Sequence, residues 1–154
     1  GVVATGPEGA QMPLVQSGEA PAQPYAGFWI PKTALQDARY PPQDVRRYVA
    51  SSEVPYLAVP PELLKLGVSL GNLARVTYAG RSAYALVADV GPSGRLGEGS
   101  ILLAQRLGIP ADARGGGVRG SVRYEVMLGS GRKQPLDAAA VDEQGAALFA
   151  GDPR

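Results

Sequence analysis

The sequence predicts a mainly β fold with short helices, arranged as a small barrel. The chain of 154 residues contains 21 glycines and 14 prolines, so turns are frequent, yet 45% of it is hydrophobic. That is enough apolar material for a single domain with a real core. Short apolar runs between turn signals give about six or seven strands and about two or three helices. These elements lack the strand–helix alternation of a doubly wound sheet.

The first half of the chain is predicted to be short strands and turns. The first elements are a hairpin of residues 2–4 and 14–16, a strand over Phe28–Ile30, a loop or one helical turn within 33–42, and another turn within 44–49. A strand over Val54–Val59 follows, which Pro55 makes an edge or irregular strand. A helix over Glu62–Leu66 is then opened by Pro60 and Pro61.

The second half is more sharply patterned. Residues 73–78 and 81–89 form the clearest hairpin, joined at Ala79 and Gly80. Ser100 is placed to cap a helix over 101–107, which Gly108 ends. A strand over 121–128 follows, with Val122, Tyr124, Val126 and Leu128 on one face. An amphipathic helix over 135–149 closes the chain, with apolar contacts at Leu136, Val141, Leu148 and Phe149 despite Gly145.

Two carboxylates stand at the two ends of a glycine-rich loop between the 81–89 strand and the 101–107 helix. Asp89 follows an apolar strand, so partial desolvation should raise its pKa and favour the protonated form. Glu98 precedes a helix N-terminus, whose positive end favours the anion. Two carboxyl groups in such different surroundings suit general acid/base catalysis. We therefore expect Asp89 to be the general acid and Glu98 the general base, although the reverse order is not excluded by sequence.

The composition excludes several function classes. The chain has no cysteine and no histidine, which rules out thiol chemistry, histidine triads and His/Cys metal sites. A formal net charge of +1 with scattered arginines gives no basic footprint for nucleic acid or an anionic membrane. No apolar run approaches the roughly 20 residues of a membrane span. We expect no metal, no cofactor and a monomer.

The run DVGPSGRLGEGSILLAQRLGIP (89–110) resembles the signature of the glycoside hydrolase family 75 chitosanases, in which a D-x-G-P segment leads into G-E-x-S and a helix. The upstream runs KTALQDARYPPQDVRRYV (32–49) and VPYLAVPPELLKLGVSLGNLARVTYAGRSAYALVADVGP (54–92), and the closing run over 122–151, are similar to the bacterial branch of that family.

This resemblance implies a fold, an activity and a pair of essential residues. The family hydrolyses chitosan, a β-1,4-linked glucosamine polymer, with inversion and without a cofactor, and its essential Asp and Glu fall on Asp89 and Glu98. The D-x-G-P turn is also similar to double-psi barrel hydrolases and lytic transglycosylases, which implies a six-stranded double-psi β-barrel. An endo-acting, secreted enzyme is therefore expected. The resemblance also implies that an N-terminal part of the domain precedes Gly1, with 152–154 as a tail.

Further substrate-binding residues are expected at Lys32, Asp37, Tyr40, Gly91 and Ser100. Each has a structural alternative: Asp37 solvates a loop or binds an amino sugar, and Ser100 is mainly a helix cap. Trp29, Tyr40 and Tyr56 stack on sugar rings or pack within the fold. A chain with 14 acidic and 15 basic residues needs local convergence of acids for a polycationic substrate, for which Asp37, Asp44, Glu53, Asp89 and Glu98 are the candidates.

Other functions remain open at this point. One is a non-catalytic carbohydrate- or cell-wall-binding barrel module, or a structural barrel of a larger secreted protein. The other is a hydrolase acting on peptidoglycan or partly acetylated chitin.

Overall fold

The computed structural model describes residues 3–5, 11–13, 31–42, 44–112 and 116–151. Its centre is a four-stranded mixed sheet in the order β3–β5–β4–β6, in which β3 runs parallel to β5 and the other pairs are antiparallel. The elements are β1 (Val3–Thr5), β2 (Gln11–Pro13), the 3₁₀ turn η1 (Val45–Arg47), β3 (Tyr56–Val59), α1 (Pro61–Lys65), β4 (Leu73–Tyr78), β5 (Arg81–Val90), α2 (Ile101–Leu107), β6 (Arg123–Met127) and α3 (Ala138–Phe149).

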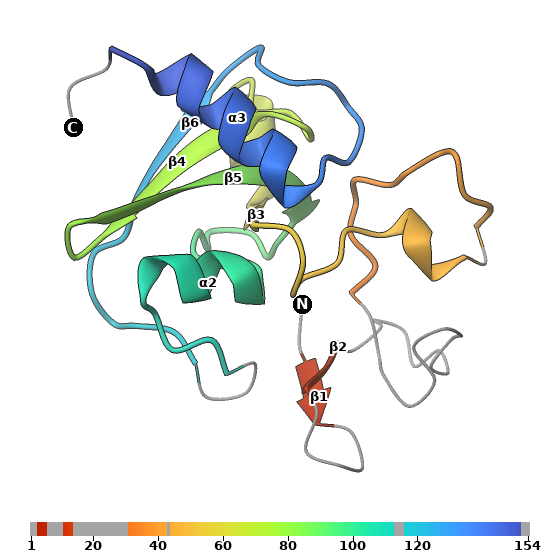
Figure 1. Ribbon diagram of the computed structural model, residues 1–154, viewed down its shortest axis with the longest axis horizontal. Helices are drawn as coiled ribbons and strands as arrows, with labels where there is room; N and C mark the ends of the chain where they lie inside the picture. The colour runs from red at the N-terminus through yellow and green to blue at the C-terminus, as the bar shows by residue number, and fades with distance from the viewer. Residues whose placement is uncertain (1–2, 6–10, 14–30, 43, 113–115, 152–154) are drawn as a thin grey trace.

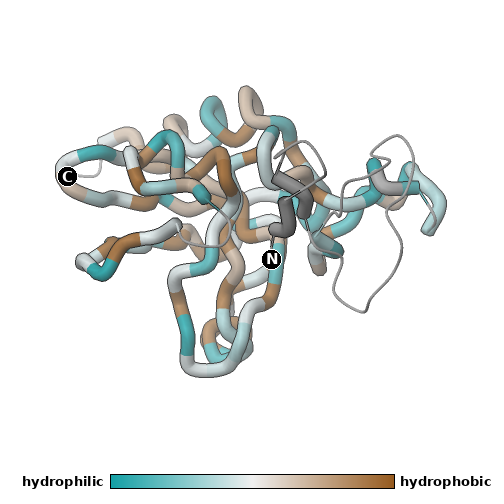
Figure 2. Tube along the Cα trace, turned by 90° about the horizontal axis from the view of Figure 1, so that it is seen from below, coloured by the Kyte–Doolittle hydropathy of each residue, from teal (hydrophilic) through white to brown (hydrophobic). Residues whose placement is uncertain are grey.

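The sheet lies between two helices, α2 on one face and α3 on the other (Figure 1). Because β3, β4 and β5 are covered on both sides, apolar residues recur along the central strands (Figure 2). The core under α2 contains Leu57, Val59, Val76, Val87, Leu103 and Leu107, and the core under α3 contains Leu35, Val49, Tyr56, Leu73, Leu86 and Val141.

The β4–β5 hairpin confirms the sharpest sequence prediction. Its two-residue turn places Ala79 at φ 47° and Gly80 at φ 79°, the left-handed pair that a type I′ turn requires. The twist of such a turn matches that of the strands, so the register is fixed from Leu73 opposite Leu86 to Tyr78 opposite Arg81.

Helix α3 packs more closely against the sheet than its sequence suggests. Val141 and Phe149 are buried as predicted, but Leu148 is 38% exposed, so the prediction for Leu148 is wrong. Gly145 faces Tyr84 of β5, and a Cβ on Gly145 would lie 2.4 Å from the Tyr84 Cγ. The glycine is therefore what lets the helix backbone approach the sheet.

Other elements match their predictions with shifted ends. The N-terminal hairpin is present as β1 and β2, while residues 14–16 and the predicted strand over 28–30 lie outside the described residues. α2 has the predicted bounds, whereas α3 begins at Ala138 with Asp137 as its N-cap. The strand predicted over 121–128 is shorter in the structure, since β6 covers Arg123–Met127, and Leu128 lies beyond it and is 56% exposed.

The mainly β fold with short helices is confirmed. A closed six-stranded barrel is not shown, because in the described part of the chain the four-stranded sheet is open, with β3 and β6 at its two edges.

Candidate functional site

Asp89 lies near the end of β5, where an irregularity in the pairing with β3 changes the direction of its side chain. Leu57 pairs with Val87 but Ala58 pairs with Asp89, so one residue of β5 is left without a partner. Because side chains alternate along a strand, a regular ladder would put Asp89 on the same face as Val87, towards α2. A bulge shifts this alternation by one residue, so Asp89 lies beside Ala58 on the face that carries Tyr56.

The Asp89 carboxyl is half-buried and held by two backbone N–H groups. Ala34 and Val90 both donate to Oδ1, at 3.0 Å and 2.9 Å. Burial raises the pKa of Asp89 above its ordinary value, the two N–H donors oppose this, and the negative charge of Glu98 adds to it. The direction agrees with the sequence-based expectation. Since both hydrogen bonds in the described part of the chain go to Oδ1, Oδ2 is the oxygen available to carry a proton.

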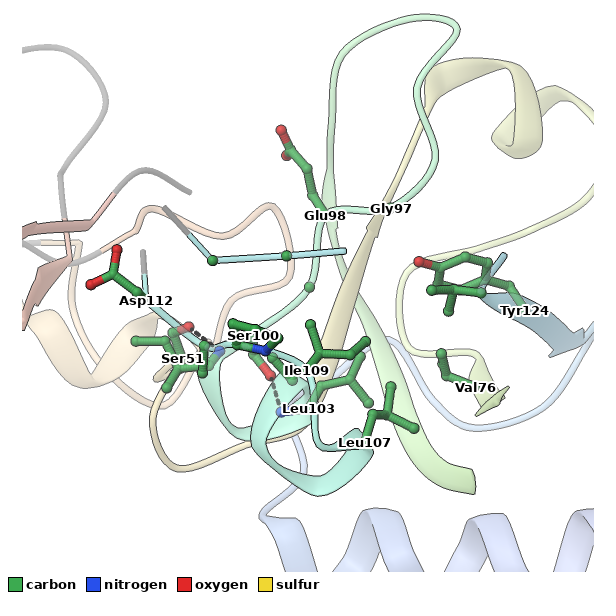
Figure 3. Close-up of a pocket in the computed structure, with 18 residues that line it drawn as sticks. Ser51, Val76, Gly97, Glu98, Ser100, Leu103, Leu107, Ile109, Asp112 and Tyr124 are labelled. Carbon is green, nitrogen blue, oxygen red and sulfur yellow. Dashed lines mark hydrogen bonds between the residues drawn. The ribbon is translucent and has the colours of Figure 1, made fainter. Parts of the chain in front are cut away.

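Glu98 is held at the outer edge of β3. Leu57 and Gly99 form an antiparallel bridge, the Ala58 N–H donates to the Glu98 carbonyl at 3.0 Å, and the Ser100 N–H donates to the Tyr56 carbonyl at 2.8 Å. The end of the glycine-rich loop therefore continues the sheet. The Glu98 side chain is exposed, and its carboxylate points away from the apolar side chains of α2 (Figure 3).

Gly91 lies beside the Glu98 carboxylate and Ala58 at one end of the sheet. A Cβ on Gly91 would lie 3.3 Å from Glu98 Oε2 and 3.6 Å from the Cβ of Ala58. Ala58 is the pairing partner of Asp89, so the Glu98 carboxylate extends over the surface next to Asp89. Substrate binding by Gly91 stays a prediction; in the structure, its missing side chain leaves space beside Glu98 Oε2.

Tyr56 is a buried residue that feels the charges of both carboxyl groups, and the sequence suggested it only as a sugar-stacking ring or a packing residue. It is 3% exposed, so it offers no face for stacking. Burial raises the pKa of Tyr56 to about 12, an interaction with the Ser51 side chain lowers it, and the charges of Asp89 and Glu98 raise it further. The phenol therefore stays protonated within electrostatic reach of both carboxyl groups.

Glu62 of α1 holds the middle of the glycine-rich loop between Asp89 and Glu98 by hydrogen bonds. No local sequence pattern predicted this role. The Ser93 hydroxyl donates to Glu62 Oε1, and the Gly94 N–H donates to Oε2 at 3.3 Å. The hydrogen bond from Ser93 lowers the pKa of Glu62. The contact spans 31 residues of sequence, so only the fold brings these groups together.

Residues 31–40 position Asp89 through Ala34, but their predicted ligand-binding side chains are engaged elsewhere. Asp37 accepts three hydrogen bonds from the Arg39 guanidinium, and this contact lowers the pKa of Asp37. The Arg46 guanidinium lies 4.6 Å from the Tyr40 ring centroid and covers that ring. Lys32 is half-buried, and Trp29 lies outside the described residues.

The expected convergence of acidic residues is limited to Asp89 and Glu98. Asp44 pairs with Arg46, as Asp37 pairs with Arg39, so both carboxylates are locally neutralised. Glu53 lies exposed in a turn after Ser51.

Ser100 is a structural residue rather than a substrate contact. It is fully buried, and its Oγ accepts hydrogen bonds from the Tyr56 N–H at 3.0 Å and the Leu103 N–H at 3.1 Å. One hydroxyl therefore caps α2 and fixes the helix to β3, as its cap role predicted.

A pocket of about 370 Å³ opens beside Glu98. Its floor is apolar, with side chains from β4, α2 and the segment after α2, and the ring of Tyr124 forms one wall (Figure 3). Glu98 and Asp112 are the acidic residues among those that line it, and Asp89 is not, so the pocket adjoins Glu98 alone of the two paired acids. The floor consists of Val76, Leu103, Leu107 and Ile109.

The arrangement can support proton transfer by two unlike carboxyl groups. Asp89 is half-buried with a raised pKa, and Glu98 is exposed beside it. Within the described ranges, no group of three or more acidic side chains is placed to hold a metal ion, and none of the helices has the length and hydrophobicity to cross a bilayer.

A scan against protein-family models finds no match for the chain, and a comparison with curated proteins finds no significant match.

Proposed function

We propose that the protein is an endo-acting glycoside hydrolase that cleaves β-1,4 bonds of a chitosan-like polymer with inversion, as in the family 75 chitosanases that its sequence resembles. The observation that carries the proposal is the placement of Asp89 and Glu98 at one end of the β3–β5 pair, one half-buried and one exposed. The Asp89 carboxyl accepts from the Ala34 N–H, and the Glu98 backbone carbonyl accepts from the Ala58 N–H, so a distant segment positions each residue.

In the proposed reaction, Asp89 donates the proton on Oδ2 to the glycosidic oxygen as its bond to the anomeric carbon breaks. Glu98 takes a proton from a water molecule, whose oxygen bonds to the anomeric carbon from the opposite side. Inversion requires the two carboxyls to stand roughly 6.5–9.5 Å apart, leaving room for that water. The phenol of Tyr56 stays neutral within electrostatic reach of the two acids, so it adds no charge to the site.

The proposal extends to the setting of the enzyme. It acts as a secreted monomer on an extracellular polysaccharide, without nucleic acid or membrane partners. Under this proposal its four-stranded sheet belongs to a six-stranded double-psi barrel, as the sequence resemblance implies.

The test is the appearance of new reducing ends when the protein is incubated with chitosan. Wild type should release them, and Asp89→Asn and Glu98→Gln should each lower the rate by roughly 10²-fold or more. Glu143→Gln on the exposed side of α3 removes one carboxylate elsewhere and should match wild type. Binding of chitosan without cleavage by any variant would instead indicate a carbohydrate-binding module.

The roles of the two acids are separated by pH. Because the pKa of Asp89 is raised, it is the better general acid, and Asp89→Asn should remove the basic limb of the pH–rate profile. Loss of the acidic limb in this variant would reverse the assignment.

A further inference from the structure

The glycine-rich loop that leads to Glu98 is attached to the sheet at both of its ends. At the start, the Gly91 N–H donates to the Val59 carbonyl at 2.9 Å. At the end, the Ala58 N–H donates to the Glu98 carbonyl at 3.0 Å. Residues 92–97 between these two anchors are exposed. A segment with exposed backbone and few buried contacts opens at low cost, so the position of this stretch depends on whatever else holds it.

Glu62 of α1 holds this exposed stretch. Its two carboxylate oxygens accept from the Ser93 hydroxyl and from the Gly94 N–H, and we call this pair of hydrogen bonds the Glu62 clasp. Among the described residues, the clasp supplies the hydrogen bonds that reach 92–97 from another element, since the remaining one is internal to the loop. Hydrogen bonds to an ionised acceptor are stronger than those between neutral groups.

Glycines on the Glu98 side of the clasp make the loop dependent on it. Gly94 has φ 71° and Gly97 has φ 139°, and Gly97 directly precedes Glu98. Glycine has the largest conformational freedom to lose, so a loop released from Glu62 gains many alternative conformations. The carbonyl side of Glu98 is fixed by the sheet. Freedom at Gly97 therefore acts on the amide side of Glu98, and with it on the direction of the Glu98 side chain.

We propose that Glu62 is a positioning residue for Glu98: it clasps the loop to α1 and so holds the Glu98 carboxylate where it accepts a proton from the attacking water. Glu62 itself takes no part in the bond changes. This inference rests on the proposed hydrolase function, but the clasp is measurable without catalysis. Because the clasp acts on the reacting carboxylate and not on the substrate, its loss should lower kcat and leave KM within about twofold of wild type.

The first experiment shortens the side chain without removing its charge. Glu62→Asp keeps an acid in the first turn of α1 but is one methylene shorter, so it cannot reach the loop, and kcat should fall roughly tenfold. Glu62→Gln keeps one acceptor oxygen and should lose less. Lys65→Ala changes a charge on the exposed side of the same helix and should match wild type. Wild-type kcat in Glu62→Asp, or a change in KM alone, would overturn the inference.

Two readouts separate the clasp from a general effect on the fold. Circular dichroism and melting temperature should be unchanged in Glu62→Asp, because the residue is exposed. Ser93→Ala removes one of the two hydrogen bonds and should lower kcat roughly threefold alone, but have no further effect in Glu62→Asp, where its partner is already out of reach. Losses that multiply in the double variant would mean that the two residues act separately, which would refute the clasp.

The last experiment follows the loop itself by limited trypsin digestion and mass spectrometry. Arg95 lies in the exposed stretch, and cleavage after it follows the population of the open loop, so Glu62→Asp should speed it roughly fivefold. Cleavage after Arg39, which is 81% exposed in another segment, should not change. If cleavage after Arg95 rises but no protein releases reducing ends, the clasp stands and the hydrolase function fails. An unchanged rate after Arg95 would refute the clasp even in an active enzyme.

Discussion

Replacing Gly91 with alanine should move the Glu98 carboxylate while leaving the stability of the fold nearly unchanged. The new methyl group would lie 3.3 Å from Glu98 Oε2, closer than such contacts ordinarily come, so the carboxylate must move by a few tenths of an ångström. Misplacing a reacting group by about 1 Å costs on the order of 10²-fold in rate, so we expect a roughly tenfold loss of kcat. Gly91 does not have a positive φ, so the substitution also removes conformational freedom from the unfolded chain.

The free energy of unfolding of Gly91→Ala should therefore stay within about 1 kcal/mol of wild type. Gly94→Ala is the matched control: Gly94 has φ 71° and nothing within 4 Å of its Cβ position. It should cost about 1 kcal/mol of stability through left-handed strain, with a smaller effect on kcat. The assays are reducing-end release and urea unfolding. Full activity in Gly91→Ala would refute the reasoning, because the Glu98 carboxylate would then not need its observed place.

Three further predictions concern stability. Asp89→Asn should raise the melting temperature at neutral pH. The pKa of Asp89 is higher in the folded protein than in the unfolded chain, so the protein loses stability as pH rises from the unfolded pKa through the folded pKa. Asparagine cannot ionise and avoids this loss. The difference should vanish in melts below about pH 3, where Asp is protonated in both states. Ser100→Ala should cost roughly 2 kcal/mol or more in urea unfolding, since it removes a helix cap and leaves the Tyr56 N–H buried without its acceptor. Gly145→Ala should destabilise by about 1–3 kcal/mol, because overlap with Tyr84 outweighs the gain in helix propensity.

Each of these predictions has a clear contrary outcome. A pH-independent difference in melting temperature for Asp89→Asn would mean that its carboxyl titrates normally. A loss below about 0.5 kcal/mol for Ser100→Ala would mean that the two backbone donors find other acceptors. A stabilised Gly145→Ala would show that the helix can move off the sheet without cost, and Ala146→Gly, at an exposed site on the same helix, measures propensity alone.

The sequence predicted well those elements whose determinants are local. The β4–β5 hairpin follows from Ala79 and Gly80 between two apolar runs, and α2 follows from Ser100 and Gly108 at its ends. The raised pKa of Asp89 was predictable too, since it depends on the apolar strand that precedes it. These features need no knowledge of what packs against them.

The missed features depend on contacts between distant segments. The bulge that turns Asp89 towards Tyr56 arises from pairing with β3, and nothing in the β5 sequence marks it. Glu62 reads as an ordinary first-turn acid of a helix until the fold brings Ser93 to it. Asp37 looked available because its neighbours are a loop, whereas Arg39 encloses its carboxylate.

An open sheet has two edge strands with unpaired backbone groups, and this protein protects its two edges in different ways. Along β3, the 98–100 segment occupies the outer edge through its bridge at Leu57. Along β6, the exposed side chains include Arg123, whose guanidinium pairs with Glu125 of the same strand, while Glu125 also neutralises the buried Arg75 of β4.

The first solution links the placement of Glu98, one of the two proposed catalytic acids, to protection against aggregation. The 98–100 segment positions Glu98 and also covers the edge of β3. Loss of this segment would expose an unpaired strand that can pair with another molecule. We therefore expect a variant with a shortened or more flexible loop to self-associate before its melting temperature changes.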